Sequence, residues 1–254
     1  MKPAGLASDL LDLFLPRSCL GCGSWIPAKE GKGLICARCS TLLRPPPPPR
    51  CPRCDAPQGT SRPSGTPCLE CADWPTVLVS ARSAVVMEAP ADALIHALKY
   101  AGWRCLGEEL GRRMARLGPF SRELPVLVPI PTTPARRKKR GYNQARVLAE
   151  VVAREWKAPL LDVLDRLSGG TQVRSGPAER TLNVQGSFRI RPHYRSQIRG
   201  REVILIDDVL TTGATALSAA SELGRHDAGS VRLLAFARAL PLGFEARELG
   251  AGPG

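Results

Sequence analysis

The chain has 254 residues, a net charge of +13 at pH 7 and nine cysteines. No apolar run approaches the roughly 18–20 residues that a membrane span requires. The first residues have the spacing of a short amphipathic helix rather than the apolar core of a secretory signal, so we expect a cytoplasmic protein. The positive charge favours phosphorylated or polyanionic partners, although an arginine-rich solvated surface would give the same balance.

Composition divides the chain into an N-terminal module (residues 1–75), a main domain (76–240) and a C-terminal tail (241–254). The main domain alternates apolar, strand-length runs with helical stretches, which predicts an α/β fold with a mostly parallel sheet flanked by helices. In chain order we expect strands at Thr76–Val86, Val126–Pro129, Leu160–Val163 (weaker), Val203–Ile206 and Val231–Ala235, and helices at Pro90–Tyr100, Leu106–Leu117, Asn143–Trp156 and Gly213–Leu223. Residues 168–201 show no clear element.

Eight cysteines fall in four CxxC pairs, and thirteen residues separate both the first two and the last two pairs. Two CxxC turns can complete a closed tetrahedral zinc site, so we expect two structural Zn²⁺ ions in a double zinc ribbon, each ion held by four cysteines. The sets, paired sequentially, are Cys19, Cys22, Cys36, Cys39 and Cys51, Cys54, Cys68, Cys71. A cross-braced pairing is the alternative, but the five prolines of residues 45–49 should form a stiff polyproline spacer that keeps the units apart.

The module could be a platform for a partner or nucleic acid, or could serve folding alone. The ninth cysteine, Cys105, is expected to be a small buried residue rather than a nucleophile.

Residues 203–215 read VILIDDVLTTGAT. A buried parallel strand should end at the carboxylates Asp207 and Asp208, and a small-residue turn then leads into a helix. Such a turn offers backbone N–H groups to an anion, while carboxylates accept hydrogen bonds from vicinal hydroxyls, so the combination would recognise ribose 5-phosphate. The alternative is a strand followed by a capped helix with Asp in the turn. The stretch resembles the phosphoribosyl-pyrophosphate (PRPP) motif of type I phosphoribosyltransferases at every position.

Three further stretches carry a wider resemblance: HALKYAG at 96–102, LVPIPTTPARRKKRGYNQ at 127–144, and the four CxxC pairs. Their order resembles the ComF family, phosphoribosyltransferase-like proteins associated with DNA uptake in naturally competent bacteria, and covers about residues 17–240. Residues 173–177 depart from the family pattern between the matching Gln172 and Arg180, Asn183 and Val184. This departure concerns the acceptor side of an active site.

The resemblance implies a type I phosphoribosyltransferase-like fold that binds PRPP with Mg²⁺. Asp207 and Asp208 would hold the ribose hydroxyls, and Lys99, in a loop after the first helix, would neutralise pyrophosphate. The residues expected to cradle the 5′-phosphate are Thr211, Thr212, Gly213, Ala214 and Thr215, and those expected to form a mobile basic loop are Arg136, Arg137, Lys138, Lys139 and Arg140. The basic run could instead be a solvated cluster or a polyanion-binding patch. His96, His193 and His226 are scattered, and none stands out as a general base.

Three functions compete. The first is Mg²⁺-dependent phosphoribosyl transfer to an unidentified acceptor, in which Asp207, Asp208, Lys99 and Arg140 are the candidate catalytic residues. The second is non-catalytic binding of single-stranded DNA during uptake, with a helicase-type partner. Its few stacking candidates are Trp25, Trp74, Trp103 and Tyr142, so contacts with the phosphate backbone would dominate. The third is a zinc-stapled scaffold without chemistry.

Overall fold

The structure is a computed structural model that describes residues 17–27, 33–58, 68–120, 123–167 and 186–240. The expected amphipathic helix at the start of the chain, residues 172–184 and the C-terminal tail lie outside these ranges. No helix among the described residues is long and apolar enough to cross a membrane.

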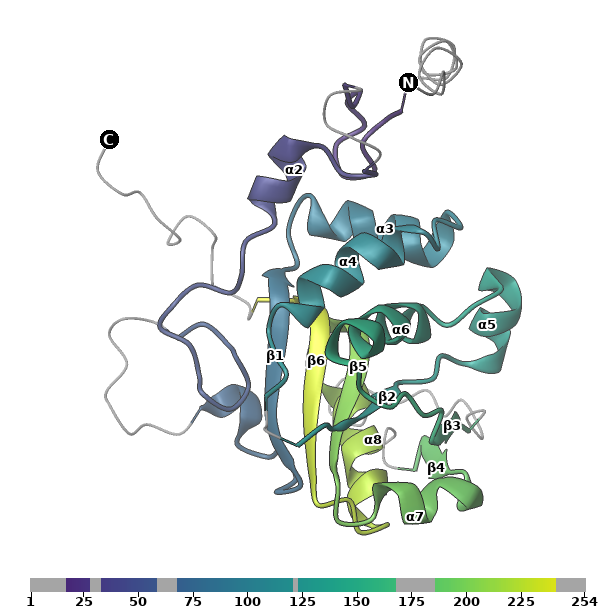
Figure 1. Ribbon diagram of the computed structural model, residues 1–254. Helices are drawn as coiled ribbons and strands as arrows, with labels where there is room; N and C mark the ends of the chain where they lie inside the picture. The colour runs from purple at the N-terminus through teal and green to yellow at the C-terminus, as the bar shows by residue number, and fades with distance from the viewer. Residues whose placement is uncertain (1–16, 28–32, 59–67, 121–122, 168–185, 241–254) are drawn as a thin grey trace, which may run out of the picture.

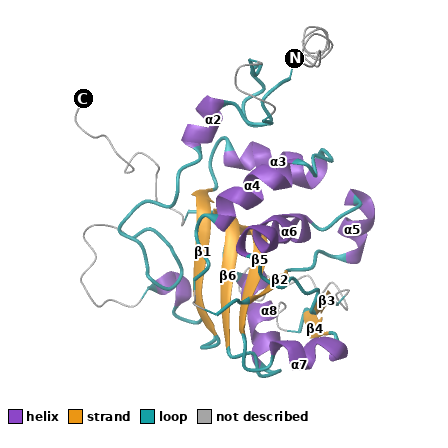
Figure 2. Ribbon diagram, viewed as in Figure 1, coloured by secondary structure: helices purple, strands orange, loops and turns teal. Residues whose placement is uncertain are grey.

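A four-stranded parallel sheet forms the centre of the molecule (Figures 1 and 2). Its strands are β1 (Leu78–Val86), β2 (Val126–Pro129), β5 (Glu202–Leu210) and β6 (Ser230–Arg238), in the order β1-β6-β5-β2. The central strands β5 and β6 each contain a continuous buried apolar run, Val203–Ile206 and Leu233–Ala237, as expected for strands covered on both faces. The predicted α/β fold is confirmed.

Helices cover both faces of this sheet. The helices α3 (Ala91–Tyr100), α4 (Leu106–Ala115) and α6 (Gln144–Trp156) pack on one face, where their apolar sides meet strand residues such as Ile204 and Phe236. On the other face, α8 (Ala214–Gly224) packs against residues such as Leu205 and Leu233. These two apolar clusters form the core of the protein.

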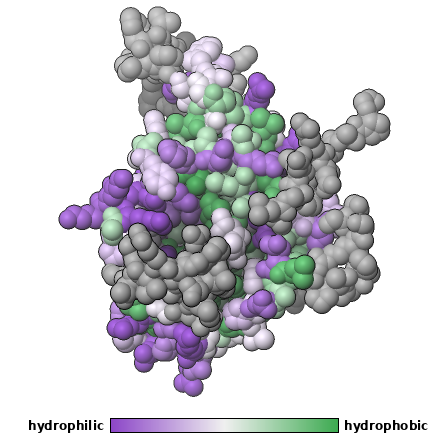
Figure 3. Space-filling model, turned by 180° about the vertical axis from the view of Figure 1, so that it is seen from behind, coloured by the Kyte–Doolittle hydropathy of each residue, from purple (hydrophilic) through white to green (hydrophobic). Residues whose placement is uncertain are grey.

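The helix between β2 and α6 corrects one expectation, because the basic run forms α5 (Pro134–Arg140) rather than a loop. The side chain of Thr133 accepts a hydrogen bond from the backbone N–H of Arg136, and Pro134 occupies the first helical position. Gly141, with φ of 83°, ends the helix in the left-handed conformation. Figure 3 shows hydrophilic side chains gathered at the edge of the molecule where α5 lies.

Two further segments differ from expectation. The weak strand near Leu160 is an isolated parallel bridge to Leu127 at the edge of the sheet. The supposedly irregular segment after residue 185 contains β4 (Phe188–Ile190), which pairs antiparallel with β3 (Leu164–Arg166), a 3₁₀ turn (Pro192–Tyr194) and α7 (Arg195–Ile198). These elements are short and polar, so they carry little periodicity.

The first cysteine unit, which contains α2 (Ala37–Leu42), docks on the helical face near α4. The guanidinium of Arg113 donates to the backbone oxygens of Ser40 and Leu43, and Glu109 accepts from the N–H of Leu34. The proline segment that follows contains neither helix nor strand and bends at Pro48–Pro49.

The second unit, which contains the 3₁₀ turn Leu69–Cys71, docks beside β1, on the side of the sheet that α8 covers. Arg53 donates to the carbonyl oxygens of Cys71, Trp74 and Leu78, and the buried carboxylate of Asp55 accepts from the N–H of Ser83. The cysteine units therefore belong to different faces of the same core.

Candidate functional site

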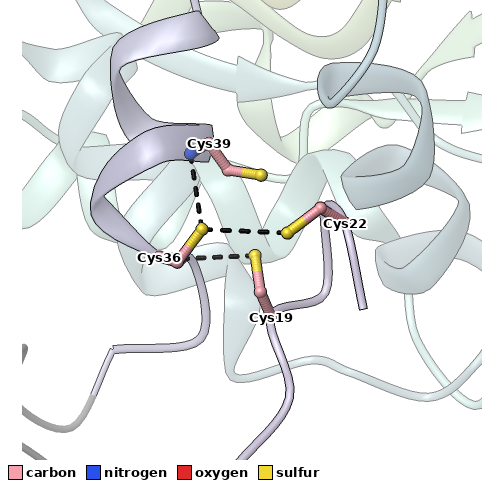
Figure 4. A group of neighbouring side chains, drawn as sticks. All are labelled: Cys19, Cys22, Cys36 and Cys39. Atoms are coloured by element: carbon pink, nitrogen blue, oxygen red, sulfur yellow. Dashed lines mark hydrogen bonds between the residues drawn. The ribbon is translucent and has the colours of Figure 1, made fainter. Parts of the chain in front are cut away.

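The first four cysteines converge on one point (Figure 4). The Sγ atoms of Cys22 and Cys36 are 3.8 Å apart, and the backbone N–H groups of Cys36 and Cys39 donate to the Sγ atoms of Cys19 and Cys36. Tetrahedral zinc with bonds of about 2.3 Å places its sulfurs about 3.8 Å apart. A disulfide would need about 2.05 Å. The cluster therefore has the geometry of a closed structural zinc site.

The second cluster repeats this geometry. Its Sγ atoms are 3.8 Å apart between Cys51 and Cys71 and 3.7 Å apart between Cys54 and Cys68. In each cluster all four Sγ atoms lie within 4.8 Å of one another. The sequential pairing is confirmed, and the ninth cysteine belongs to neither set. Contrary to expectation, Cys105 is exposed, because it precedes α4 outside the apolar stripe of that helix.

The acid pair lies inside β5 rather than after it, because pairing with β6 continues to Leu210. The pair lines a cavity of about 270 Å³ at the carboxyl end of the sheet. The cavity, called here the acid-pair cavity, is lined by Lys99, Tyr100, Ile130, Pro131, Thr132, Arg136, Arg140, Gln144, Arg166, Asp207, Asp208, Val209, Thr211 and Thr215. Open α/β sheets bind ligands at this end of their strands.

Asp208 is 4% exposed and forms an ion pair with Lys99 from α3. Its other oxygen accepts a hydrogen bond of 3.3 Å from Nε2 of Gln144, and the Oε1 of that residue accepts in turn from Arg140. The Arg140 guanidinium also lies 5.2 Å from the ring centroid of Tyr100. The network ties α3, α5 and α6 to the carboxylate. It also corrects the position of Lys99, which lies in the last turn of α3 and not in the following loop.

Asp207 faces the opposite side of β5, since successive side chains alternate along a strand. Burial raises the pKa of Asp207 well above its usual value, and the charge of Asp208 raises it further. Arg166 also lines this side of the cavity, and burial together with the charge of Arg136 lowers the pKa of its guanidinium. A proton on Asp207 therefore relieves the repulsion between the adjacent carboxylates.

The segment after β5 passes through Gly213, whose φ is 79°, and then begins α8. The hydroxyl of Thr212 accepts a hydrogen bond from the N–H of Ala214. A smaller hollow of about 50 Å³ is lined by the whole of the predicted loop, Thr211–Thr215, together with Asp207. Loop and acid pair therefore share one site, with the first backbone N–H groups of an eleven-residue helix beside it.

The basic residues of α5 divide between three surfaces. Arg136 and Arg140 line the acid-pair cavity, and Arg137 lines a neighbouring cavity with Arg146 and Arg191. Lys139 lines a shallow hollow beside Tyr100, whereas Lys138 lines none of these. Of the five basic residues that the sequence predicted at the site, two therefore line the same cavity as the acid pair.

Sequence reasoning assigned no role to Gln144, Arg166 and Thr132, which also line the site. Gln144 ends the quoted RGYNQ stretch, so its motif was visible but its contact with Asp208 was not. Arg166 and Thr132 stand outside recognisable patterns. Tyr142 lies elsewhere: its hydroxyl donates to the carbonyl oxygen of Leu98.

Comparison with known proteins agrees with this architecture. The double zinc ribbon domain family matches residues 10–72, and the phosphoribosyl transferase domain family matches residues 142–241. The DNA utilization protein YhgH of Escherichia coli (strain K12) is 27% identical over 238 residues, or 90% of this chain and 100% of that protein. Competence protein ComFC of Bacillus subtilis (strain 168) is 41% identical over 90 residues, or 35% of this chain and 34% of ComFC.

Competence protein F of Haemophilus influenzae is 28% identical over 116 residues, or 45% of this chain and 50% of that protein. Among solved structures, the allosteric regulatory enzyme of purine biosynthesis is 18% identical with a TM-score of 0.35, and covers 51% of this chain and 25% of its own. Adenine phosphoribosyltransferase from Leishmania donovani is also 18% identical, with a TM-score of 0.34 and coverage of 65% and 63%.

The parallel sheet, the matched domain and the two four-cysteine clusters define a phosphoribosyltransferase-type α/β protein with an N-terminal double zinc ribbon. Within that class the two matched domains and the competence and DNA utilization relatives identify the chain as a member of the ComF family.

Proposed function

We propose that the chain binds PRPP together with Mg²⁺ in the acid-pair cavity, and that two Zn²⁺ ions occupy the cysteine clusters. One observation carries the first proposal: a single cavity joins an acid pair, a small-residue loop at a helix start and the cations Lys99, Arg136 and Arg140. PRPP carries the matching groups: ribose hydroxyls, a 5′-phosphate and a pyrophosphate.

Each group of the site has a role in this proposal. Asp207 and Asp208 accept hydrogen bonds from the ribose hydroxyls, and the backbone N–H groups of 211–215 bind the 5′-phosphate. Lys99 turns from Asp208 towards the pyrophosphate, where Arg136 and Arg140 add positive charge. Carboxylate and phosphate oxygens are the ligands that Mg²⁺ prefers, and the ion supplies charge neutralisation at the pyrophosphate when bound. If transfer follows, the same contacts hold the leaving group while an acceptor attacks C1.

Calorimetric titration of the zinc-loaded protein with PRPP and Mg²⁺ tests the binding. We expect saturable binding by the wild type and none by the Asp207→Asn/Asp208→Asn double variant. The exposed Asp73→Asn variant is the control, since it removes a carboxylate outside the cavity and should bind as the wild type does. Absence of wild-type binding at millimolar PRPP would contradict the proposal.

A second candidate function is binding of single-stranded DNA in DNA uptake, in keeping with the names of the competence and DNA utilization relatives. Two exposed aromatics favour it: Tyr100 and Trp103 are 66% and 41% exposed. Tyr100 lies beside Arg140 of α5, and Trp103 precedes Arg104 in the chain. Aromatic rings beside guanidinium and ammonium groups suit unpaired bases and their phosphates.

Fluorescence anisotropy of a labelled oligothymidylate at several salt concentrations tests this function. Neutralising Arg136, Arg137, Lys138 and Lys139 with glutamine should weaken binding and reduce the salt slope by about 0.7 for each lost phosphate contact. A control removes equal charge elsewhere, at the exposed Arg38, Arg116, Arg189 and Arg195. An equal loss in both variants would show that only net charge matters and would reject a site on α5.

A further inference from the structure

The side chain of Trp74 lies between the second cysteine cluster and residues 211–215, called here the phosphate-binding loop after the role proposed for them. Its backbone N–H donates to the carbonyl oxygen of Cys71, a member of that cluster. On the other side, a Cβ atom placed on Gly213 would lie 3.7 Å from the Cζ2 atom and 3.9 Å from the Nε1 atom of the indole. Trp74 is only 7% exposed. The indole therefore packs against the loop, and the residue that carries it is hydrogen-bonded to the second cysteine unit.

The indole also carries a buried donor without an acceptor. Its Nε1 atom has no hydrogen-bond partner among the described residues. A buried N–H of this kind costs stability unless some state of the protein satisfies it. The Nε1 atom lies 3.9 Å from a Cβ atom placed on Gly213, so the turn at Gly213 is a neighbouring source of backbone acceptors.

A second contact route leads from the same cluster to the same loop. The guanidinium of Arg238, 2% exposed, donates to the backbone oxygen of Cys54 at 2.7 Å. Arg238 ends β6 directly opposite Leu210, the residue before the loop, and Ala239 donates to the carbonyl oxygen of Leu210 at 2.9 Å. The first cluster packs elsewhere, since Gly21, beside Cys39, lies against Pro90 at the start of α3, and the unit binds Arg113 of α4.

We propose that the second cysteine cluster, with its metal, sets the position of the phosphate-binding loop. Trp74 is the positioning residue, because it contacts both the cluster and the loop. The indole ring supports the loop, and its N–H gains an acceptor in the loop backbone when the loop closes on a phosphate. The identity of the phosphate ligand rests on the proposed function. The support of the loop by the indole does not, since it exists in the ligand-free protein.

Two substitutions of Trp74 in the full-length, zinc-loaded protein separate these roles, with zinc content measured for each. Trp74→Leu removes the ring, and should speed hydrogen exchange of the backbone amides of 211–216 by at least about tenfold. Trp74→Phe keeps a ring but removes the donor. It should leave exchange of the free protein unchanged and weaken PRPP binding by about fivefold, the effect of one neutral hydrogen bond. The matched control is Trp25→Phe, an indole that is 61% exposed in the first unit.

The outcomes decide between the possibilities. Unchanged exchange in Trp74→Leu with two zinc ions bound would overturn the coupling. If Trp74→Leu loses its metal, the Trp74→Phe variant decides. A Trp74→Phe protein that holds two zinc ions and binds PRPP as tightly as the wild type would overturn the donor role and with it the proposal. If the wild type binds no PRPP, the proposed function fails, and the exchange measurement alone tests the coupling. The effect should be absent in Trp25→Phe.

Discussion

Lys99 forms an ion pair with Asp208, and this contact fastens the last turn of α3 to the carboxyl end of β5. The lysine is partly buried and the carboxylate almost wholly so. Lys99 therefore satisfies Asp208 from the position that a cation or the hydroxyls of a ligand would take.

Replacing Lys99 with methionine should destabilise the protein by about 2 kcal/mol, because it leaves a buried carboxylate without its partner. Denaturant unfolding measures the loss. The exposed Lys139→Met variant is the control and should change stability by less than about 0.5 kcal/mol. The double variant Lys99→Met/Asp208→Asn should recover most of the stability, and a purely additive double variant would refute the pairing.

Asp207→Asn should stabilise the ligand-free protein at neutral pH by at least about 1 kcal/mol, while it abolishes PRPP binding. The raised pKa of Asp207 means that the folded protein holds this proton more tightly than the unfolded chain. Its contribution to stability is therefore complete below the usual value of 3.8 and falls as pH rises towards the folded pKa. Asparagine does not titrate, so melting temperatures of the variant and wild type should diverge as pH rises. Parallel curves, such as we expect for Asp73→Asn, would contradict this account.

Arg238→Gln should accelerate the loss of one zinc ion to a chelator. A divalent cation held by four thiolates carries net negative charge, and the buried guanidinium of Arg238 lies against Cys54 in the second cluster. Release should be faster by about tenfold for that ion alone, as for other residues that support metal ligands. Arg113→Gln is the counterpart at the first cluster, since Arg113 binds Ser40 there. If both variants released the same ion faster, the assignment would be wrong.

Gly213→Ala should weaken PRPP binding by about tenfold and lower stability by about 1 kcal/mol, because φ of 79° is unfavourable for alanine. The added methyl group would also contact Leu210 and Trp74 at 3.5 and 3.7 Å. Gly23→Ala, at φ of 73° with open space around it, is the matched control in the first unit. It should lose similar stability yet bind PRPP normally; equal loss of binding in both variants would point to a global effect.

Patterns local in sequence predicted much of the fold. The CxxC spacing predicted both cysteine clusters, since each ligand pair is fixed by one turn. The apolar run at 203–206 predicted the central strand, but its continuation to Leu210 depends on pairing with β6, a contact between distant segments. The helix α5 was missed because a dense run of like charge has no apolar face, although Thr133, Pro134 and Gly141 signalled its ends.

The site was predicted less completely than the fold. The acid pair and the loop form a contiguous motif, so the sequence brings them together. Gln144, Arg166 and Trp74 reach the site from three separate segments, and only the three-dimensional packing joins them. Trp74 was considered for stacking with DNA, but it is buried beneath the loop.

Each cysteine unit contributes its ligands to the apolar cluster on one side of the sheet: Cys19, Cys36 and Cys39 on one face, Cys51, Cys54 and Cys71 on the other. An ion that binds only the native state shifts the folding equilibrium of everything packed with it, by mass action. Metal supply would thus act on the sheet as a whole, and chains without metal would be exposed to proteolysis. The number of working molecules in a cell would then follow the local availability of the ion.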